Sequence, residues 1–154
     1  MHTPGAASVD ARRRWMGILA KAAPGELESV CGALGTLPAY TWLRPPETGL
    51  VMVRGRIGGT GAKFNVGEMT VTRCTLRTDS GLTGFAYVRG RDARHAELAA
   101  IVDAMMQDAA HTAGIASAVI VPLERLQDGR RRRAAGKAAA TRVEFYTVVR
   151  SAAA

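Results

Sequence analysis

The chain has 154 residues, 47% of them hydrophobic, and its 21 Lys+Arg against 13 Asp+Glu give a formal net charge of +8. This length is enough for a single domain with a hydrophobic core that needs neither disulfides nor a metal. The opening residues contain no apolar segment of signal-peptide type, and no run approaches the roughly 20 apolar residues of a membrane span, so we expect a cytoplasmic protein.

Two amphipathic helices are predicted in the first third of the chain. Asp10 is a suitable N-cap for a helix that runs to Ala22, and Pro24 is well placed in the first turn of a second helix that Gly35 ends. Apolar residues recur along both helices at three- and four-residue spacing, which predicts a buried core face or a subunit interface. They are Trp15, Ile18, Leu19 and Ala22 in the first helix, and Leu27, Val30, Cys31 and Leu34 in the second.

The middle of the chain has the alternating pattern of β-strands. A short strand at 40–44 is expected to be broken by Pro45 and Pro46, since proline cannot donate a hydrogen bond to a neighbouring strand. Three further strands follow at 49–57, 69–77 and 82–89, the last two joined by a turn at Asp79-Ser80-Gly81. Successive strands joined in this way predict an antiparallel meander.

The remaining third is predicted to be mainly helical. Asp92 can cap a helix that continues to about His111. The apolar run 116–121 is compatible with a strand or an extended connection, and 123–140 is weakly helical with Gly129 and Gly136 inside it. Residues 143–149 alternate again and are predicted to form a strand that joins the sheet.

Together these elements predict one α+β domain over residues 1–154. Its antiparallel β-meander sheet is joined by a C-terminal strand, and the N-terminal helix pair and the long central helix pack on it. Residues 1–9 and 150–154 are expected to be flexible.

A glycine-rich loop follows the second predicted strand, as Arg56-Ile57-Gly58-Gly59-Thr60-Gly61. It lacks the Gly-Lys-Ser/Thr ending of a P-loop, and it is followed by a strand pattern, which excludes a dinucleotide-binding fingerprint. Two hypotheses remain, a tight structural turn or an anion site built from loop N–H groups with Arg56, Lys63 and Arg73.

Five arginines recur along the predicted meander, and we expect them to share one surface, on one side of the sheet, for phosphate or carboxylate groups. An Arg- and Ala-rich gene composition explains the excess of cations equally well. The arginines concerned are Arg54, Arg56, Arg73, Arg77 and Arg89.

Short sequence motifs, in a fixed order over nearly the whole chain, resemble those of the PhnG family of the bacterial carbon–phosphorus lyase system. The chain contains Arg14-Trp15-Met16, Glu47-Thr48-Gly49-Leu50-Val51, Arg56-x-Gly-Gly-Thr-Gly-x-x-Phe64-x-x-Gly67-Glu68-x-Thr70-x-Thr72-Arg73, Gly90-Arg91-Asp92-x-x-His95-Ala96-Glu97 and 142–150. A single motif such as Gly-Gly-Thr-Gly is weak evidence, whereas the full set of motifs in this order is specific for the family.

This resemblance implies a subunit of a multi-subunit complex for phosphonate catabolism. Its partners would be PhnI-, PhnH- and PhnJ-like chains and an ATP-binding-cassette-like protein. The complex would transfer an alkylphosphonate to C1 of the ribose of ATP (as Mg-ATP), with release of adenine, as an EC 2.7.8-type transferase. The nucleosidase-type chemistry is attributed to the PhnI subunit, so the isolated chain is expected to be inactive and to bind no cofactor of its own.

The candidate site residues fall in two groups. Arg56, Gly58, Gly59, Thr60, Gly61 and Arg73 are the candidates for binding anions or substrate, and Arg91, Asp92, His95 and Glu97 for contacting a partner. His95 is also a weak catalytic candidate, because the start of a helix disfavours imidazolium and a neutral ring can act as a base. A satisfied interface histidine explains it equally well.

Other residues are expected to be structural. Cys31 and Cys74 are far apart in apolar surroundings and are predicted to be buried thiols, and no His or Cys pair has metal-ligand spacing. The run 130–133 of four arginines is explained by a solvated helix face. The alternative function is a non-catalytic basic module that binds nucleotide or nucleic acid, although no stacking aromatics flank the arginine run.

Overall fold

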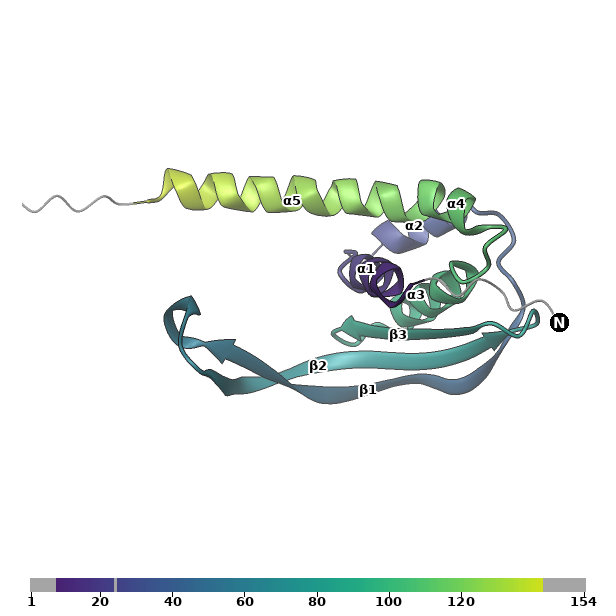
Figure 1. Cartoon of the computed structure of the whole chain (residues 1–154), viewed down its shortest axis with the longest axis horizontal. Coiled ribbons are helices and arrows are strands. Elements are labelled where there is room, and N and C mark those ends of the chain that lie inside the picture. The colour runs from purple at the N-terminus through teal and green to yellow at the C-terminus, as the bar shows by residue number, and fades with distance from the viewer. Residues whose placement is uncertain (1–7, 24, 143–154) are drawn as a thin grey trace, which may run out of the picture.

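The structure, a computed structural model, describes residues 8–23 and 25–142 and has an α+β fold. A three-stranded antiparallel sheet of order β1-β2-β3 is covered on one face by helices (Figure 1). The elements are α1 (Val9–Ala20), α2 (Glu26–Gly32), β1 (Tyr40–Arg56), β2 (Lys63–Thr78), β3 (Thr83–Arg89), α3 (Ala93–Met105), α4 (Thr112–Ile115) and α5 (Val121–Ala140), with single turns at Ile57–Gly59 and Ala116–Ile120. The predicted α+β meander is confirmed, whereas Pro24 and the predicted strand at 143–149 lie outside the described residues.

The core extends from strands β2 and β3 through α3 to the other helices. Leu76 of β2, Val88 of β3 and Ile101 of α3 are almost completely buried there. The close approach depends on Gly84 of β3, since a Cβ at this position would lie 1.9 Å from the carbonyl oxygen of Ala100 in α3. A residue with no side chain therefore brings helix and strand into contact.

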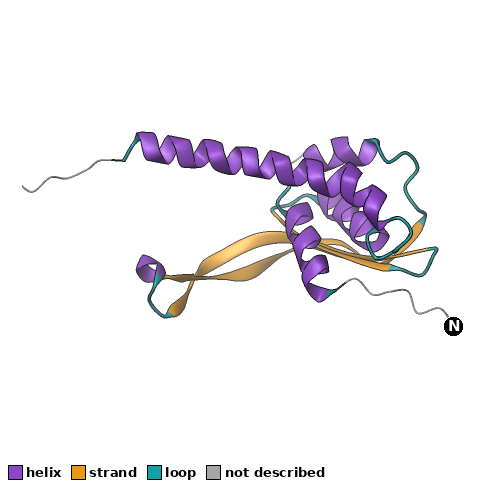
Figure 2. Ribbon diagram, turned by 45° about the horizontal axis from the view of Figure 1, so that its top comes forward, coloured by secondary structure: helices purple, strands orange, loops and turns teal. Residues whose placement is uncertain are grey.

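Two arms extend from this core in the same direction (Figures 1 and 2). One is the far half of the β1–β2 hairpin, and the other is the C-terminal half of α5, where residues 131–140 are all exposed. The hairpin arm carries exposed apolar side chains, among them Ile57 at 76% and Leu50 at 63% exposure. A two-stranded ribbon without a core is at best marginally stable in water, so this arm is suited to being covered by another protein.

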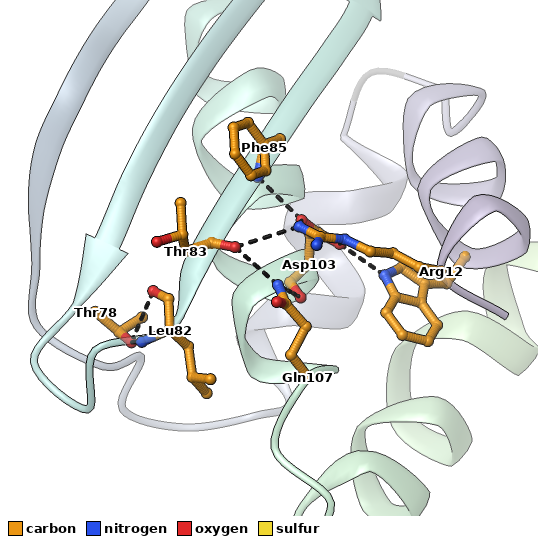
Figure 3. A network of polar contacts seen from close by, with 8 residues as sticks. Arg12, Thr78, Leu82, Thr83, Phe85, Asp103 and Gln107 are labelled. Carbon is orange, nitrogen blue, oxygen red and sulfur yellow. Dashed lines mark hydrogen bonds and ion pairs between the residues drawn. The ribbon is translucent and has the colours of Figure 1, made fainter. Parts of the chain in front are cut away.

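A buried carboxylate ties α1, α3 and β3 together (Figure 3). Asp103 of α3 is fully buried and accepts hydrogen bonds from Arg12 at 2.7 and 3.1 Å and from the Trp15 indole at 2.8 Å. The N–H of Phe85, in edge strand β3, donates to the same carboxylate at 3.0 Å. Helix α1 and strand β3 therefore both donate to one acceptor group of α3.

Strand β1 differs from its prediction, because Pro45 and Pro46 do not end it. The register shifts between Arg44 and Glu47, which leaves both prolines without partner residues in β2. Among the described strands β1 pairs only with β2 and lies at the edge of the sheet, so the missing N–H groups break no ladder there. One 17-residue strand replaces the two predicted ones.

The segment predicted as a strand or an extended connection, 116–121, is instead helical. It forms a π-helical turn between α4 and α5, and Pro122 lies in the first turn of α5, where its missing N–H is tolerated. Two smaller corrections concern helix ends: α3 ends at Met105, not near His111, and Ser8, not Asp10, caps α1 by accepting from the Ala11 N–H at 3.2 Å. The capping role of Asp92 is confirmed, since it accepts from the His95 N–H at 2.8 Å.

Candidate functional site

A hollow of about 960 Å³ lies where the two arms leave the core. Its walls come from the end of α1 and the following turn, from the middle of β1 and β2, from the end of β3, from the start of α3 and from α5. The floor is apolar and the polar wall is dominated by cations. The apolar side chains include Val51, Met69, Val71 and Val88, and the cations are Lys21, Arg89, Arg91 and Arg130.

The four cations come from distant parts of the chain. Arg130 is held in place by Glu26 of α2, with which it forms an ion pair, and by the carbonyl of Lys21, to which it donates at 3.2 Å. No ion pair within the described part of the chain involves Lys21, Arg89 or Arg91. The hollow therefore carries positive charge that these residues do not neutralise.

The segment Gly90-Arg91-Asp92 is fixed by a buried hydroxyl. Thr72 of β2 donates to the Gly90 carbonyl at 2.7 Å and accepts from the Asp92 N–H at 3.1 Å. Gly90 adopts a φ of 90°, which a residue with a side chain rarely adopts. This turn from β3 into α3 holds Arg91 at the wall of the hollow.

His95 lines the hollow and also joins two helices. It is 8% exposed, and its Nε2 lies 2.8 Å from the Leu19 carbonyl, which can only accept, so Nε2 carries a proton. In the neutral ring the lone pair is therefore on Nδ1. The bond attaches the end of α1 to the start of α3, which supports a structural role for this histidine.

Glu97, the fourth interface candidate, lies away from the hollow. It accepts a short hydrogen bond from the Tyr40 hydroxyl and pairs with Arg94 at 3.0 Å. Burial, and secondarily this carboxylate, raises the pKa of Tyr40 to about 12. The predicted group is thus divided, with Arg91, Asp92 and His95 at the hollow and Glu97 bound into a separate pair.

The glycine loop lies at the tip of the hairpin, where it forms a tight turn. Gly58 and Gly59 have φ values of 59° and 79°, and Arg56 donates to the Gly61 carbonyl at 2.7 Å. The Gly61 N–H in turn donates to the Ile57 carbonyl at 3.2 Å. The structural-turn hypothesis accounts for each of these contacts.

The expectation that five arginines share one surface is wrong. In the register, Arg77 pairs with Thr41 and Arg56 with Lys63, near opposite ends of β1 and β2. At about 3.3 Å per residue this separation is roughly 50 Å. Arg73 lies between them and forms an ion pair with Glu47 at 2.5 Å, so its guanidinium already has a carboxylate partner.

The buried thiols do not suggest chemistry. Burial raises the pKa of Cys31 and of Cys74 to about 11, so neither forms the reactive thiolate at neutral pH.

Within residues 8–23 and 25–142, no three His, Cys, Asp or Glu side chains gather as metal ligands. None of the helices described there has the length and apolar content needed to cross a membrane.

The sequence predicts only part of the hollow. The motif indicates Arg91, Asp92 and His95, whereas Lys21 has no local signal and Arg89 belongs to the predicted group of meander arginines. The sequence pattern predicts a solvated helix face for Arg130. It is half-buried, unlike the exposed arginines that follow it in α5.

Comparison with known proteins identifies the family. Residues 10–151 match the model of the family described as phosphonate metabolism protein PhnG. A relative from Rhizobium meliloti (strain 1021), named alpha-D-ribose 1-methylphosphonate 5-triphosphate synthase subunit PhnG, is 47% identical over 144 residues, which cover 94% of this chain and 92% of the relative. The chain belongs to the PhnG family of phosphonate metabolism proteins.

Proposed function

We propose that this chain is a non-autonomous subunit of alpha-D-ribose 1-methylphosphonate 5-triphosphate synthase. The observation that carries the proposal is the 47% identity to the Rhizobium meliloti subunit over 94% of this chain. In the reaction a phosphonate oxygen bonds to C1 of the ribose of ATP while the bond from C1 to adenine breaks. Adenine leaves, and the 5-triphosphate stays on the sugar.

The proposed partners are PhnI-, PhnH- and PhnJ-like subunits and an ATP-binding-cassette-like protein, in the cytoplasm. The exposed apolar side chains of the hairpin arm support a subunit role, because such an arm gains stability when a partner covers it. We assign bond breaking to the PhnI-like partner and expect the isolated chain to be inactive. The substrates of the complex are Mg-ATP and an alkylphosphonate.

The contribution of this chain is proposed to be the positioning of anions and partners. Breaking the bond to adenine creates a cation-like sugar while a triphosphate and a phosphonate must be held in place, and fixed guanidinium groups are suited to that. We propose Asp92, His95 and Glu97 for the partner surface, and Arg91 either for that surface or for holding an anion. The alternative location for the anion is the hairpin tip, with Arg56, Gly58, Gly59, Thr60 and Gly61, together with Arg73.

Omission of this chain tests the proposed function. With all subunits co-expressed, phosphonate-dependent release of adenine from ATP is expected, and the chain should co-purify with its PhnI-like partner. Without this chain, adenine release should fall to the level seen without phosphonate. Full activity without it would contradict the proposal, and a chain that stays alone and binds RNA with a steep salt dependence would favour the alternative basic module.

A further inference from the structure

We infer that the hollow lined by Lys21, Arg89, Arg91 and Arg130 binds a nucleoside triphosphate, with the phosphates on its cations and the nucleoside on its apolar floor. This inference rests on the proposed function, because it names the substrate part that this subunit holds. It moves the anion site from the hairpin tip, where the sequence pattern placed it, to the base of the two arms.

The size of the hollow fits a molecule of this class. Small-molecule sites in proteins are typically about 300–1,000 Å³, and this hollow measures about 960 Å³. Its walls come from elements at both ends of the chain and from the sheet between them. The fold therefore forms this open hollow before any ligand binds.

The charge of the hollow calls for an anion. Many arginines elsewhere are neutralised, for example Arg12 by Asp103, Arg14 by Glu124 and Arg94 by Glu97. Arg130 is paired with Glu26, but Lys21, Arg89 and Arg91 form no ion pair among the described residues. Like charges around one cavity repel each other until an anion binds between them.

The carboxylate of Asp92, which lines the wall of the hollow, already forms a structural hydrogen bond. Asp92 accepts the His95 N–H at 2.8 Å as the cap of α3, so it is fixed at the end of the helix. The hydroxyl of Thr72, which is 1% exposed, holds the turn that carries Arg91. The backbone at Arg91 is therefore fixed before an anion binds, so no loop has to be ordered at this wall, which favours affinity.

The apolar floor distinguishes a nucleotide from a simple phosphate. Inorganic phosphate or a small phosphonate needs only the cations, and it would leave the partly exposed side chains of Val51 and Met69 in contact with water. A base or ribose packed on these side chains would remove that apolar surface from water. We therefore expect ATP to bind more tightly than inorganic triphosphate, and both more tightly than methylphosphonate.

Titration of the full-length chain tests this inference, first alone and then in the assembled complex. The probes are ATP, inorganic triphosphate, methylphosphonate and adenosine, and the variants are Lys21→Gln and Arg91→Gln. Each variant should weaken ATP and triphosphate binding by about tenfold, since each removes a charge-assisted hydrogen bond. Arg132→Gln is the matched control because it removes the same charge from an exposed position of α5, and it should change binding by less than about twofold.

Three results would overturn the inference. Equal weakening by Arg132→Gln would show attraction by the general positive field, and unchanged affinity in both hollow variants would show that the ligand binds elsewhere. Loss of co-purification in Arg91→Gln, with triphosphate binding unchanged, would show that a partner's carboxylate fills the hollow. If the wild-type chain fails to assemble, the proposed function fails, while the titration of the isolated chain still decides whether the hollow binds triphosphate.

Discussion

Asp103→Ala is expected to lower the free energy of unfolding of the full-length chain by about 3–5 kcal/mol, the cost typical of breaking a buried ion pair. The carboxylate is fully buried, and Arg12, Trp15 and Phe85 all donate to it. Its removal leaves the Arg12 charge, whose side chain is 28% exposed, and the buried indole N–H without their acceptor. Urea unfolding followed by circular dichroism measures the difference.

Two further variants separate charge from packing at this position. Asp103→Asn keeps the volume and an acceptor oxygen, so it should cost less than Asp103→Ala but remain clearly destabilising. Asp128→Ala removes an exposed carboxylate that pairs with Arg131 at 3.4 Å, and it should change stability by less than about 1 kcal/mol. If Asp103→Ala cost no more than Asp128→Ala, the buried network would not be what joins α1, α3 and β3.

Gly84→Ala is expected to destabilise the fold by about 3 kcal/mol or more, at the upper end of overpacking effects. The added Cβ would lie 1.9 Å from the Ala100 carbonyl oxygen and 3.1 Å from the Ala104 Cβ, so α3 would have to move away from the sheet. Backbone atoms in a helix core cannot yield as a flexible side chain does. The same unfolding measurement reports the loss.

Gly67→Ala is the matched control for this substitution. Gly67 is also a strand residue, but it lies in the exposed arm, where an added Cβ meets nothing within 4 Å. Stability should therefore stay within about 0.5 kcal/mol of the wild type, as for most exposed substitutions. Equal effects at the two glycines would mean that α3 does not pack as closely on β3 as the structure has it.

Local patterns predicted the elements well where one face is buried. The stripes of the first two helices and of α3 follow the 3.6-residue period, and β2 and β3 alternate, so their existence could be predicted from the sequence. Hydrophobic periodicity does not predict the structure of 116–121, because a short apolar run has the same pattern in a buried strand and in a helical turn. In the structure the segment is helical, and its Val119 and Ile120 are buried in the core.

Pro45 and Pro46 show why the rule that proline ends a β-strand can mislead. The rule assumes that the backbone at the proline must donate a hydrogen bond to a neighbouring strand. No such bond is needed here, because β1 lies at the edge of the sheet and its register shifts around both prolines. Whether a strand is at an edge depends on the whole topology, and the local sequence does not contain this information.

The hollow was harder to predict because its cations have no common motif. Arg91 belongs to a recognisable sequence motif, whereas Lys21 and Arg130 are brought beside it only by the packing of α1 and α5. The Asp103 network had one usable signal, a charged residue within the apolar stretch of α3, where an unpaired carboxylate would be costly. Its partners Arg12 and Trp15 are about 90 positions away, and their identity follows only from the fold.

The dependence of adenine release on ATP concentration, at saturating methylphosphonate, tests most directly whether this subunit holds the triphosphate in its hollow. In the reconstituted complex, Arg91→Gln should raise the KM for ATP about tenfold through lost binding of the phosphates. Arg56→Gln, which changes the hairpin tip, should raise it by less than about twofold. The opposite pattern, with the tip variant impaired and the Arg91 variant normal, would contradict the account and return the anion site to the glycine loop.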